Sequence, residues 1–394
     1  MKPIHYLVAF ITLNHGTLAA ARVAVSLYAV HLDASPTVVG ILIALFSVIP
    51  TLACVPVGRL VDRTGARKPM LISTLLASAG VVLPFFWEGM TTLFLTGLIV
   101  GGACFALYIV NTGLGGRYGG AEDRTANFAR MHLGIAVSNG VGPLIAGFGI
   151  DYLGFAHTFL LIAMLPLLSL SFLMLRTLPK LDEIAAPVQD EGKPSFVELL
   201  RDRRMFPIYV MAVYFMLAWD IFMVMTPLYG AQLQLSASQI GVIISSFSVA
   251  VFAVRICTTP LARRFTTWQL MLLSLAVAGT SMLGFGLVSA VPLLIIFAFG
   301  MGFGQGMGSP VGSAALYEVA PAHRVTEALG LRMAVTTACQ TGLPLVAGGV
   351  SSLIGVAPLF WLAGAVIFAG VWHYRGHWYG GHGGHGVADE KGGT

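Results

Sequence analysis

The stretch Gly58-Arg59-Leu60-Val61-Asp62-Arg63-Thr64-Gly65-Ala66-Arg67-Lys68-Pro69 joins two long apolar runs, residues 38–60 and 69–87. Its charged side chains are one acid, Asp62, among four cations. An apolar run of about 20 residues is long enough to cross a bilayer as a helix, and its charged flanks then lie in water. The stretch therefore predicts a loop between two membrane-spanning helices.

The other basic residues extend this pattern along the whole chain. All but two of the 22 Lys and Arg residues fall in segments that share one side of a membrane if every apolar run crosses it once. The connections on the opposite side carry none, and the two exceptions, Arg22 and Arg255, lie inside apolar runs. Because basic loops stay in the cytoplasm, we expect both termini there, in a multi-pass protein of a bacterial inner (cytoplasmic) membrane.

The composition agrees with a membrane protein. The chain is 57% hydrophobic and only 10% charged, which is too apolar for a soluble core. In a soluble protein, a net charge of +5 favours nucleic acid as partner. In this chain the excess positive charge is explained by the basic loops on one side of the membrane. The apolar run after Lys2 has no small-residue cleavage site, so we expect a retained first helix. We expect a lipid bilayer and no nucleic acid as partner.

The apolar stretches number about twelve, each near the length that a spanning helix needs. Because backbone groups in lipid must bond to one another, each stretch is expected to be helical. The predicted spans are 5–30, 38–60, 69–87, 92–115, 128–150, 155–176, 205–229, 239–261, 268–288, 291–316, 328–350 and 354–373. The predicted fold is all-α and membrane-integral, with two six-helix bundles at 1–176 and 205–374, a cytoplasmic linker at 177–204 and a disordered Gly/His-rich tail at 375–394.

The two halves repeat each other at an offset of 201 residues. One repeated segment is Leu32-x-x-Ser35-x-x-x-x-Gly40-Ile41 with Phe46-Ser47-Val48, which returns as Leu233-x-x-Ser236, Gly241-Val242 and Phe247-Ser248-Val249. The other is Gly142-Pro143-Leu144-x-Ala146-Gly147, which returns as Leu343-Pro344-Leu345-x-Ala347-Gly348. Parallel repeats of this kind predict a substrate site near the bilayer midplane, between halves that rock to give alternating access.

The loop at 58–69 resembles the signature G-x-L-x-D-R-x-G-R-R/K of the major facilitator superfamily. The shared residues are Gly58, Leu60, Asp62, Arg63, Gly65 and Arg67. Ala66 replaces the first closing base, and Lys68 lies just beyond the match. The resemblance implies a conformational latch between the halves, formed by Gly58, Asp62, Arg63, Gly65, Arg67 and Lys68, with Gly65 permitting a tight turn. The alternative is a basic loop that sets only the topology.

A second motif lies in the predicted fifth helix. Residues 138–147 resemble the G-x-x-x-G-P-x-x-G-G motif of the drug/proton antiporter branch, which has twelve helices. The match rests on Gly142, Pro143 and Gly147, with Gly140 nearby, whereas Ser138 and Ala146 depart from it. The resemblance implies export, and ordinary helix packing by small residues is the alternative. The fourth-helix Arg typical of the branch is missing, since Gly97 or a neighbour takes its place.

Ionisable residues inside the predicted helices are the strongest functional candidates, because charge in a bilayer is costly. By the repeat offset, Arg22 corresponds to position 223, less than one helical turn from Asp220. We expect either an Arg22–Asp220 ion pair or the use of both charges by one substrate. Asp220 is the leading candidate for proton coupling, because burial favours its neutral form and a nearby Arg its ionised form. A structural salt bridge is the alternative.

Other polar residues in the apolar runs are weaker candidates for substrate contact. Arg255 can hold an anionic group or bond to helix carbonyls. Trp219 can form an apolar wall beside Asp220, and packing explains it equally well. The remaining candidates are Asn14, His15, Tyr108, Asn111 and Gln305, for which packing roles compete.

We expect no catalytic residues, no cofactor and no metal site. The apolar runs contain no nucleophile–base–acid set and no nucleotide-binding motif. The cysteines are predicted to be packing residues, because they are widely spaced in apolar segments. The tail is His-rich, which is also found in metal-binding segments, but it lacks Cys and clustered acids. Its histidines are His377, His382 and His385, and His373 lies just before it.

Two functions follow from these observations. The leading hypothesis is a secondary active transporter, a proton-coupled exporter of an amphipathic or drug-like small molecule that works by alternating access. The alternative is a carrier of small organic anions, favoured by two intramembrane arginines against one aspartate. A non-transporting membrane sensor or a lipid-linked enzyme is a distant third. The expected partners are a small-molecule substrate, protons and lipid, and the expected state is a monomer.

Overall fold

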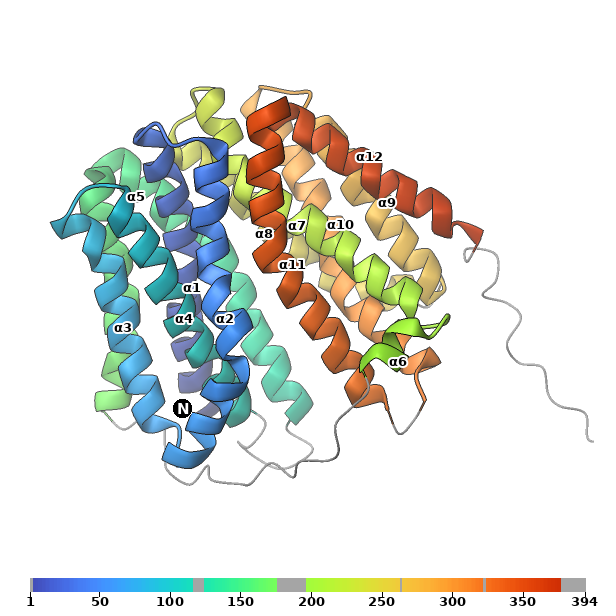
Figure 1. Cartoon of the computed structure of the whole chain (residues 1–394), viewed down its shortest axis with the longest axis horizontal. Coiled ribbons are helices and arrows are strands. Elements are labelled where there is room, and N and C mark those ends of the chain that lie inside the picture. Colours follow the sequence, from blue (N-terminus) through green and yellow to red (C-terminus); the bar gives the residue numbers. More distant parts are fainter. Residues whose placement is uncertain (1–2, 116–123, 176–195, 263, 322–323, 377–394) are drawn as a thin grey trace, which may run out of the picture.

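The computed structural model describes residues 3–115, 124–175, 196–262, 264–321 and 324–376, and within these ranges the chain forms helices and short turns without a β-strand (Figure 1). The first half contains α1 (Pro3–His31), α2 (Pro36–Thr64), α3 (Arg67–Phe86), α4 (Met90–Gly115) and α5 (Arg124–Met174). In this half α1 packs against α4 and α5, and α3 packs against α4 and α5. The order along the chain is that of the predicted spans.

The second half repeats this arrangement after a short helix, α6 (Phe196–Arg201). Its long helices are α7 (Phe206–Gln232), α8 (Ala237–Ala262), α9 (Thr267–Phe285), α10 (Val291–Val319), α11 (Val325–Ile354) and α12 (Val356–Tyr374). Within the half, α10 packs against α8 and α9, and α12 packs against α7 and α9.

Helix α5 contains two of the predicted spans, 128–150 and 155–176. Gly154 interrupts it with φ 78° and ψ 171°, a left-handed conformation that a residue with a Cβ rarely adopts. The hydroxyl of Thr158 donates to the Gly154 carbonyl at 2.6 Å, so a new helical segment starts after this residue. The bend turns the chain back across the molecule, as the two-span prediction requires.

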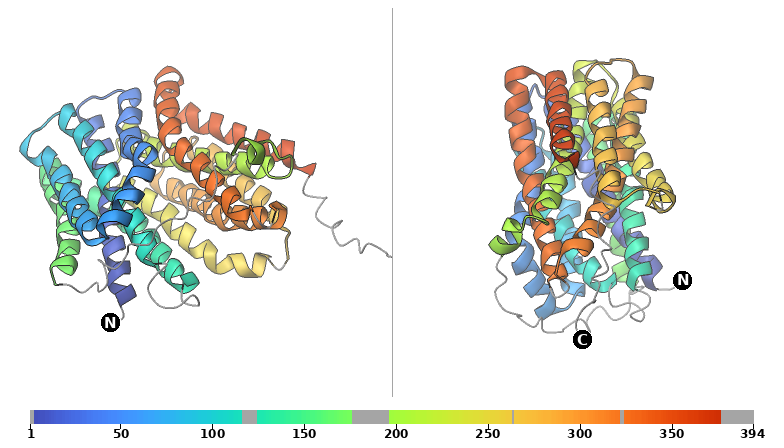
Figure 2. Two further views of the ribbon diagram at one scale, coloured as in Figure 1. Left: turned by 60° about the horizontal axis from the view of Figure 1, so that its bottom comes forward. Right: turned by 90° about the vertical axis from the view of Figure 1, so that its right-hand side faces the viewer.

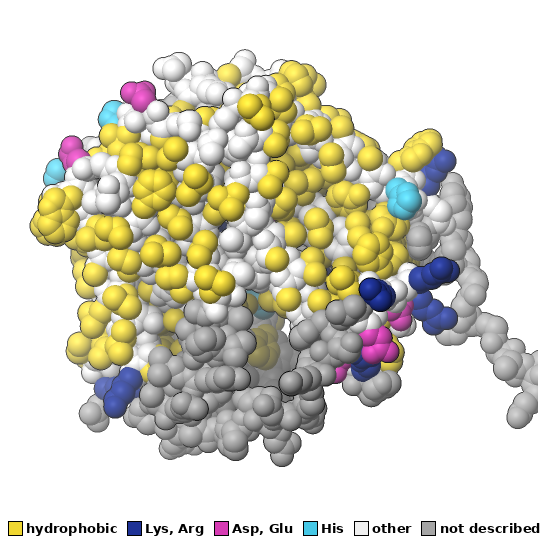
Figure 3. Space-filling model, viewed as in Figure 1, with side chains coloured by type: hydrophobic (Ala, Val, Ile, Leu, Met, Phe, Trp, Pro, Cys, Tyr) yellow, Lys and Arg dark blue, Asp and Glu magenta, His cyan; other side chains and the backbone are white. Residues whose placement is uncertain are grey.

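The described helices are suited to a membrane. Ten of them are long and apolar enough to cross one, with α5 counted once. The part of α2 whose side chains the structure describes is a shorter apolar helix, Pro36–Leu52. With α5 bent into two spans and α2 included, the predicted set of twelve crossings is accounted for. Figure 3 shows one face covered mainly by hydrophobic side chains, with charged side chains near its margins. Such a surface belongs in lipid.

The two halves meet along two pairs of helices, α2 with α11 and α5 with α8. The contacts lie toward the side that holds the turns after α1, after α7 and before α12, which we call the closed side (Figure 1, Figure 2). The ribbons of the halves diverge toward the opposite side, where the chain begins, and we call this the open side. Glycines allow the contact, since a Cβ added at Gly241 of α8 would lie 2.6 Å from the Pro143 carbonyl oxygen of α5.

The predicted linker 177–204 contains the helix α6, which the sequence did not indicate. Arg324 joins α6 to the start of α11, because its guanidinium pairs with Glu198 and with Glu327, each at 2.8 Å. Hydrogen bonds to Glu327 and Glu198 raise the pKa of Arg324 above its ordinary value. Residues 176–195 of the linker and 377–394 of the tail lie outside the described residues.

Candidate functional site

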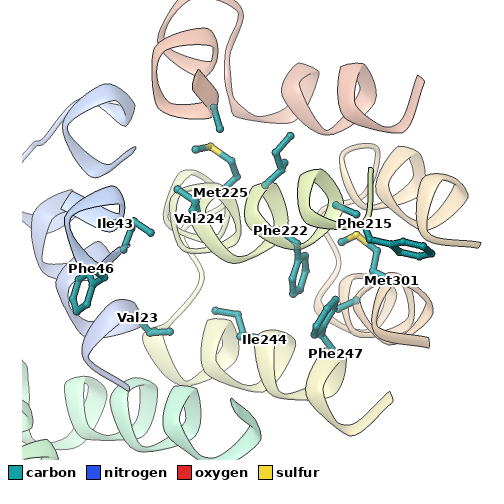
Figure 4. Packing of buried hydrophobic residues seen from close by; sticks show 14 of the residues in the cluster. Val23, Ile43, Phe46, Phe215, Phe222, Val224, Met225, Ile244, Phe247 and Met301 are labelled. Atoms are coloured by element: carbon teal, nitrogen blue, oxygen red, sulfur yellow. The ribbon is translucent and has the colours of Figure 1, made fainter. Parts of the chain in front are cut away.

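A cavity of about 190 Å³ lies between the two halves. Residues of both bundles form its walls: His15, Leu18, Ala19, Arg22, Val23, Ile43, Asn139, Pro143, Trp219, Asp220, Met223, Val224, Gln340 and Pro344. Figure 4 shows how apolar side chains near it lie, with Val23 and Ile43 from the first half and Val224 from α7 bordering the space between the halves. The position agrees with the predicted site between two repeats.

Arg22 enters this cavity from α1 and is held on the side of α2. Its Nη2 donates to the Ser47 hydroxyl at 3.2 Å, and its guanidinium carbon lies 5.7 Å from the centre of the Phe46 ring. That distance allows a cation–π attraction. Its buried Nε has no hydrogen-bond partner among the described residues. Arg22 is therefore anchored at one edge and keeps donor capacity for a ligand.

Asp220 enters the same cavity from α7 in the opposite half. Its side chain is 6% exposed, and its Oδ2 has no hydrogen-bond partner among the described residues. The residues that the structure describes include no ion pair between Arg22 and Asp220, although both line the cavity. Of the two predicted arrangements, the direct pair is not formed in this conformation. Two buried ionisable groups of opposite sign that form no direct ion pair favour a ligand that contacts both.

The rest of the cavity wall is largely apolar. Trp219 precedes Asp220 on α7, and its ring packs edge-on against Phe247 with centroids 5.1 Å apart. Met223 lies one turn further along the same helix, and Ile43 faces the cavity from α2. Asn139 and Gln340 add amide groups from α5 and α11. This combination of apolar wall and few polar groups is typical of sites for amphipathic small molecules.

A second cavity, of about 20 Å³, lies inside the first half between α1, α4 and α5. It brings together four of the predicted residues, Asn14, His15, Tyr108 and Asn111. Asn14 donates to the Phe10 carbonyl at 2.9 Å and to the Ser169 hydroxyl at 2.8 Å, so it has a structural role. Neither amide atom of Asn111 has a partner among the described residues. His15 lines both cavities and thereby connects this polar cluster with Arg22.

The predicted antiporter-type motif of α5 lies beside the central cavity. Pro143 lines it. Gly142 allows α5 to approach α1, since a Cβ there would lie 2.7 Å from the Ala19 Cβ. Gly147 faces the start of α8, where an added Cβ would meet the Ala237 backbone, and Gly140 lies beside Ser248. The motif thus sets the spacing of α5 from α1 and from the second half.

Other predicted residues lie away from the cavity or outside the described part of the chain. Gln305 is buried in α10 and does not line the central cavity. The side chain of Arg255 is not among those described, and the same holds for the stretch 53–64 with Gly58, Asp62 and Arg63. Gly65 ends α2 with φ 75°, which agrees with the predicted turn. Arg67 and Lys68 begin α3.

Sequence reasoning missed the residues that hold Arg22 and the two amides. Phe46 and Ser47 belong to the repeated Phe-Ser-Val segment, so the repeat drew attention to the positions but not to their contact with Arg22. Asn139 occupies a variable position of the α5 motif, and Gln340 had no signal beyond being an amide in an apolar run. Among the described residues, no group of three or more His, Cys, Asp or Glu side chains is arranged to hold a metal ion.

Comparison with known proteins gives a family and a fold. The model of the family described as "Major Facilitator Superfamily" matches residues 7–291 and 208–377. No curated protein matches the chain. Among solved structures, a POT family transporter in complex with 5-aminolevulinic acid is similar, with a TM-score of 0.80 and 14% identity over 95% of this chain and 96% of the other.

Two further structures have the same fold. The nucleoside transporter NupG has a TM-score of 0.75 and 14% identity, over 95% of this chain and 99% of its own. A bacterial homolog to the human lysosomal transporter Spinster, in an inward-facing and occupied conformation, has a TM-score of 0.77 and 11% identity, over 94% and 95%. At such identities the likeness is one of fold.

Proposed function

Because the chain belongs to the major facilitator superfamily, a family of transporters, we propose that it exports a small amphipathic molecule in exchange for protons. The observation that carries the proposal is the cavity between the halves, into which Arg22 and Asp220 project without pairing. The moving bodies are the bundles 1–176 and 205–374. The protein acts as a monomer in this proposal, because each chain has its own cavity.

The orientation follows from the distribution of charge. The described basic residues that flank the helices on the open side include Arg67, Lys68, Arg264 and Arg324, and the turns of the closed side carry none. Because basic loops stay in the cytoplasm, the open side faces the cytoplasm, in a bacterial inner membrane. Halves that diverge on the cytoplasmic side suit loading of an exported substrate from that side.

Arg22 and Asp220 have different roles in this scheme. Arg22 is anchored by Ser47 and Phe46, so it presents a fixed cation to an anionic group of the substrate. Asp220 is the proton site, since a carboxyl in an apolar wall is stabilised when it takes up a proton or when a cationic group approaches. A substrate cation and a proton therefore compete for Asp220, which couples their movements in opposite directions. Trp219 and Met223 bind the apolar part.

The direction of transport rests on α5. Its motif resembles that of the drug/proton antiporter branch, and Gly142, Pro143 and Gly147 pack where α5 meets α1 and the second half. The missing fourth-helix Arg is a departure from that branch, and Arg22 supplies the buried cation in this chain instead.

A carrier of small organic anions is the second candidate. The specific observation in its favour is Arg22, whose Nε has no partner among the described residues and which lies in the cavity. In that case the anion binds Arg22, and Asp220 contributes little to affinity.

The two candidates differ in the charge of the substrate, which three related probes can vary. Phenylalanine carries both charges, its methyl ester only the cation and N-acetyl-phenylalanine only the anion. Binding to the purified protein raises its apparent melting temperature. Export in exchange for protons predicts that phenylalanine or the methyl ester gives the largest increase. A largest increase with N-acetyl-phenylalanine identifies the anion carrier.

Proton coupling is then measured with the best probe in liposomes that enclose a pH-sensitive dye. The expected result is that probe transport moves protons in the opposite direction and that Asp220→Asn stops this movement while probe binding persists. The matched control is Asp33→Asn, because Asp33 is an exposed acid on the closed side. Unchanged proton movement in Asp220→Asn contradicts the proposal.

A further inference from the structure

The first turns of α2 and α8 both lie on the closed side, and each helix begins with a serine of its own. Ser35 accepts from the Val38 N–H at 3.4 Å, and Ser236 accepts from the Gln239 N–H at 3.2 Å. The other amides of a first helical turn have no partner within their helix and need acceptors from elsewhere. In this chain those acceptors come from the opposite half.

Asp151 supplies the acceptors for α8. It lies on α5 just before the bend, and its two carboxylate oxygens accept from the N–H groups of Ala237 at 3.0 Å and Ser238 at 2.8 Å. A carboxylate at a helix N-terminus is stabilised by charge-assisted hydrogen bonds and by the helix dipole. These two hydrogen bonds join the two halves directly.

Ser352 supplies the acceptor for α2 in the same way. It lies near the end of α11, and its hydroxyl accepts from the Thr37 N–H at 3.1 Å and lies 2.7 Å from the Thr37 hydroxyl. The repeat offset of 201 residues maps Thr37 onto Ser238 and Asp151 onto Ser352. Each half therefore caps a helix of the other half, at equivalent positions.

The two caps differ in a way that the backbone explains. Pro36 stands where Ala237 stands in the second half, and proline has no N–H. The start of α2 thus presents one amide where α8 presents two. A single hydroxyl is sufficient for the first, whereas the second requires the two oxygens of a carboxylate. The residue types on both sides match the number of amides to be satisfied.

We propose that Asp151 and Ser352 are gating residues, caps supplied across the interface that hold the closed side shut, and that Asp151 provides the stronger one. Opening of this side separates α5 from α8 and α2 from α11, so both caps must break and their amides must find water. Asp151 and Ser352 therefore set the balance between the two conformations without contacting the substrate. The inference requires only that the halves separate on this side, and not the proton coupling or the substrate proposed above.

The test measures how often the closed side opens in the full-length protein in lipid nanodiscs. Nitroxide labels are placed on Glu88→Cys and Leu287→Cys, which are exposed at the closed side in different halves, in a background without the native cysteines. Electron–electron distance measurement then gives the ratio of open to closed populations. We expect Asp151→Asn to raise this ratio about tenfold, because charge-assisted bonds are lost, and Ser352→Ala to raise it about threefold, because only neutral bonds to Thr37 are lost.

Two matched variants complete the experiment. Asp33→Asn removes an exposed acid from the same side and is expected to leave the ratio unchanged. Asp151→Ala removes both acceptors, whereas Asp151→Asn keeps one neutral oxygen, so Asp151→Ala is expected to raise the ratio at least as much as Asp151→Asn. If Asp151→Asn does not yield folded protein, the ratio measured for Asp151→Ala is compared with that of Asp33→Asn instead. The inference is overturned if the Asp151 variants match Asp33→Asn, or if Ser352→Ala has the larger effect.

Discussion

Two adjacent glycines of α11 provide a direct test of how the halves meet. A Cβ added at Gly348 would lie 2.7 Å from the Pro36 carbonyl oxygen and 3.0 Å from the Gly40 Cα, both on α2. A Cβ added at Gly349 would have nothing within 4 Å. Both substitutions by Ala bring the same gain in helix propensity. Only Gly348→Ala forces α11 away from α2.

The magnitude follows from this geometry. The atoms that the new methyl group meets belong to the backbone and cannot rotate away, so α2 and α11 must separate. Overpacking of this kind costs about 1–3 kcal/mol. The cost applies only while the closed side is shut, so the ratio of open to closed molecules should rise by about 5- to 150-fold. Gly349→Ala should leave the ratio unchanged.

The assay is the distance measurement between labels at positions 88 and 287, with the unsubstituted protein as reference. Thermal unfolding of both variants shows whether either is simply misfolded. If Gly348→Ala and Gly349→Ala give the same distance distribution while both are folded, the packing of α2 on α11 described above does not hold the closed side shut.

Four further substitutions test the interior and the surface. Asn14→Leu should lower the free energy of unfolding by about 1–3 kcal/mol, because it leaves the hydrogen-bond partners of Asn14 unsatisfied. Asn111→Leu should not lower it, since the Asn111 amide has no partner among the described residues. A denaturation series that ranks the two variants in the other order contradicts this difference. Trp219→Ala should weaken binding of phenylalanine methyl ester about tenfold or more, as for a buried aromatic contact; a titration with unchanged Kd excludes Trp219 from the site. Arg324→Gln should leave the apparent Tm unchanged, because its partner Glu198 is exposed and such ion pairs contribute little; a clear fall in Tm means that α6 is held more firmly than the surface geometry indicates.

The helices were predictable from the sequence because they depend on local patterns, and the positions where the halves meet lie in the repeated segments. Apolar length gave the spans. The segments that repeat at an offset of 201 include Gly40 with Gly348 and Gly241 with Gly147, which are the positions where backbones of opposite halves come together. Any added side chain there would push the helices apart, so the same small residues are required twice.

The arrangement of the site could be predicted only in part. The offset placed Arg22 and Asp220 at similar depth, and both do line one cavity. They form no direct ion pair, and Arg22 instead contacts Ser47 and Phe46, which depends on how α1 is rotated against α2. Sequence spacing does not define that rotation. The cap by Asp151 was missed for the same reason, since its partners are backbone groups 86 and 87 residues away.

The central claim is that one cavity between two halves opens to each side of the membrane in turn, and a single cysteine at the cavity wall tests it most directly. Met223→Cys is placed in the background without native cysteines, and a membrane-impermeant maleimide is added to inside-out or right-side-out vesicles. The account predicts labelling from the cytoplasmic side, and labelling from the other side that increases when Asp151→Asn is added. Labelling from neither side, or from the outside alone, contradicts it.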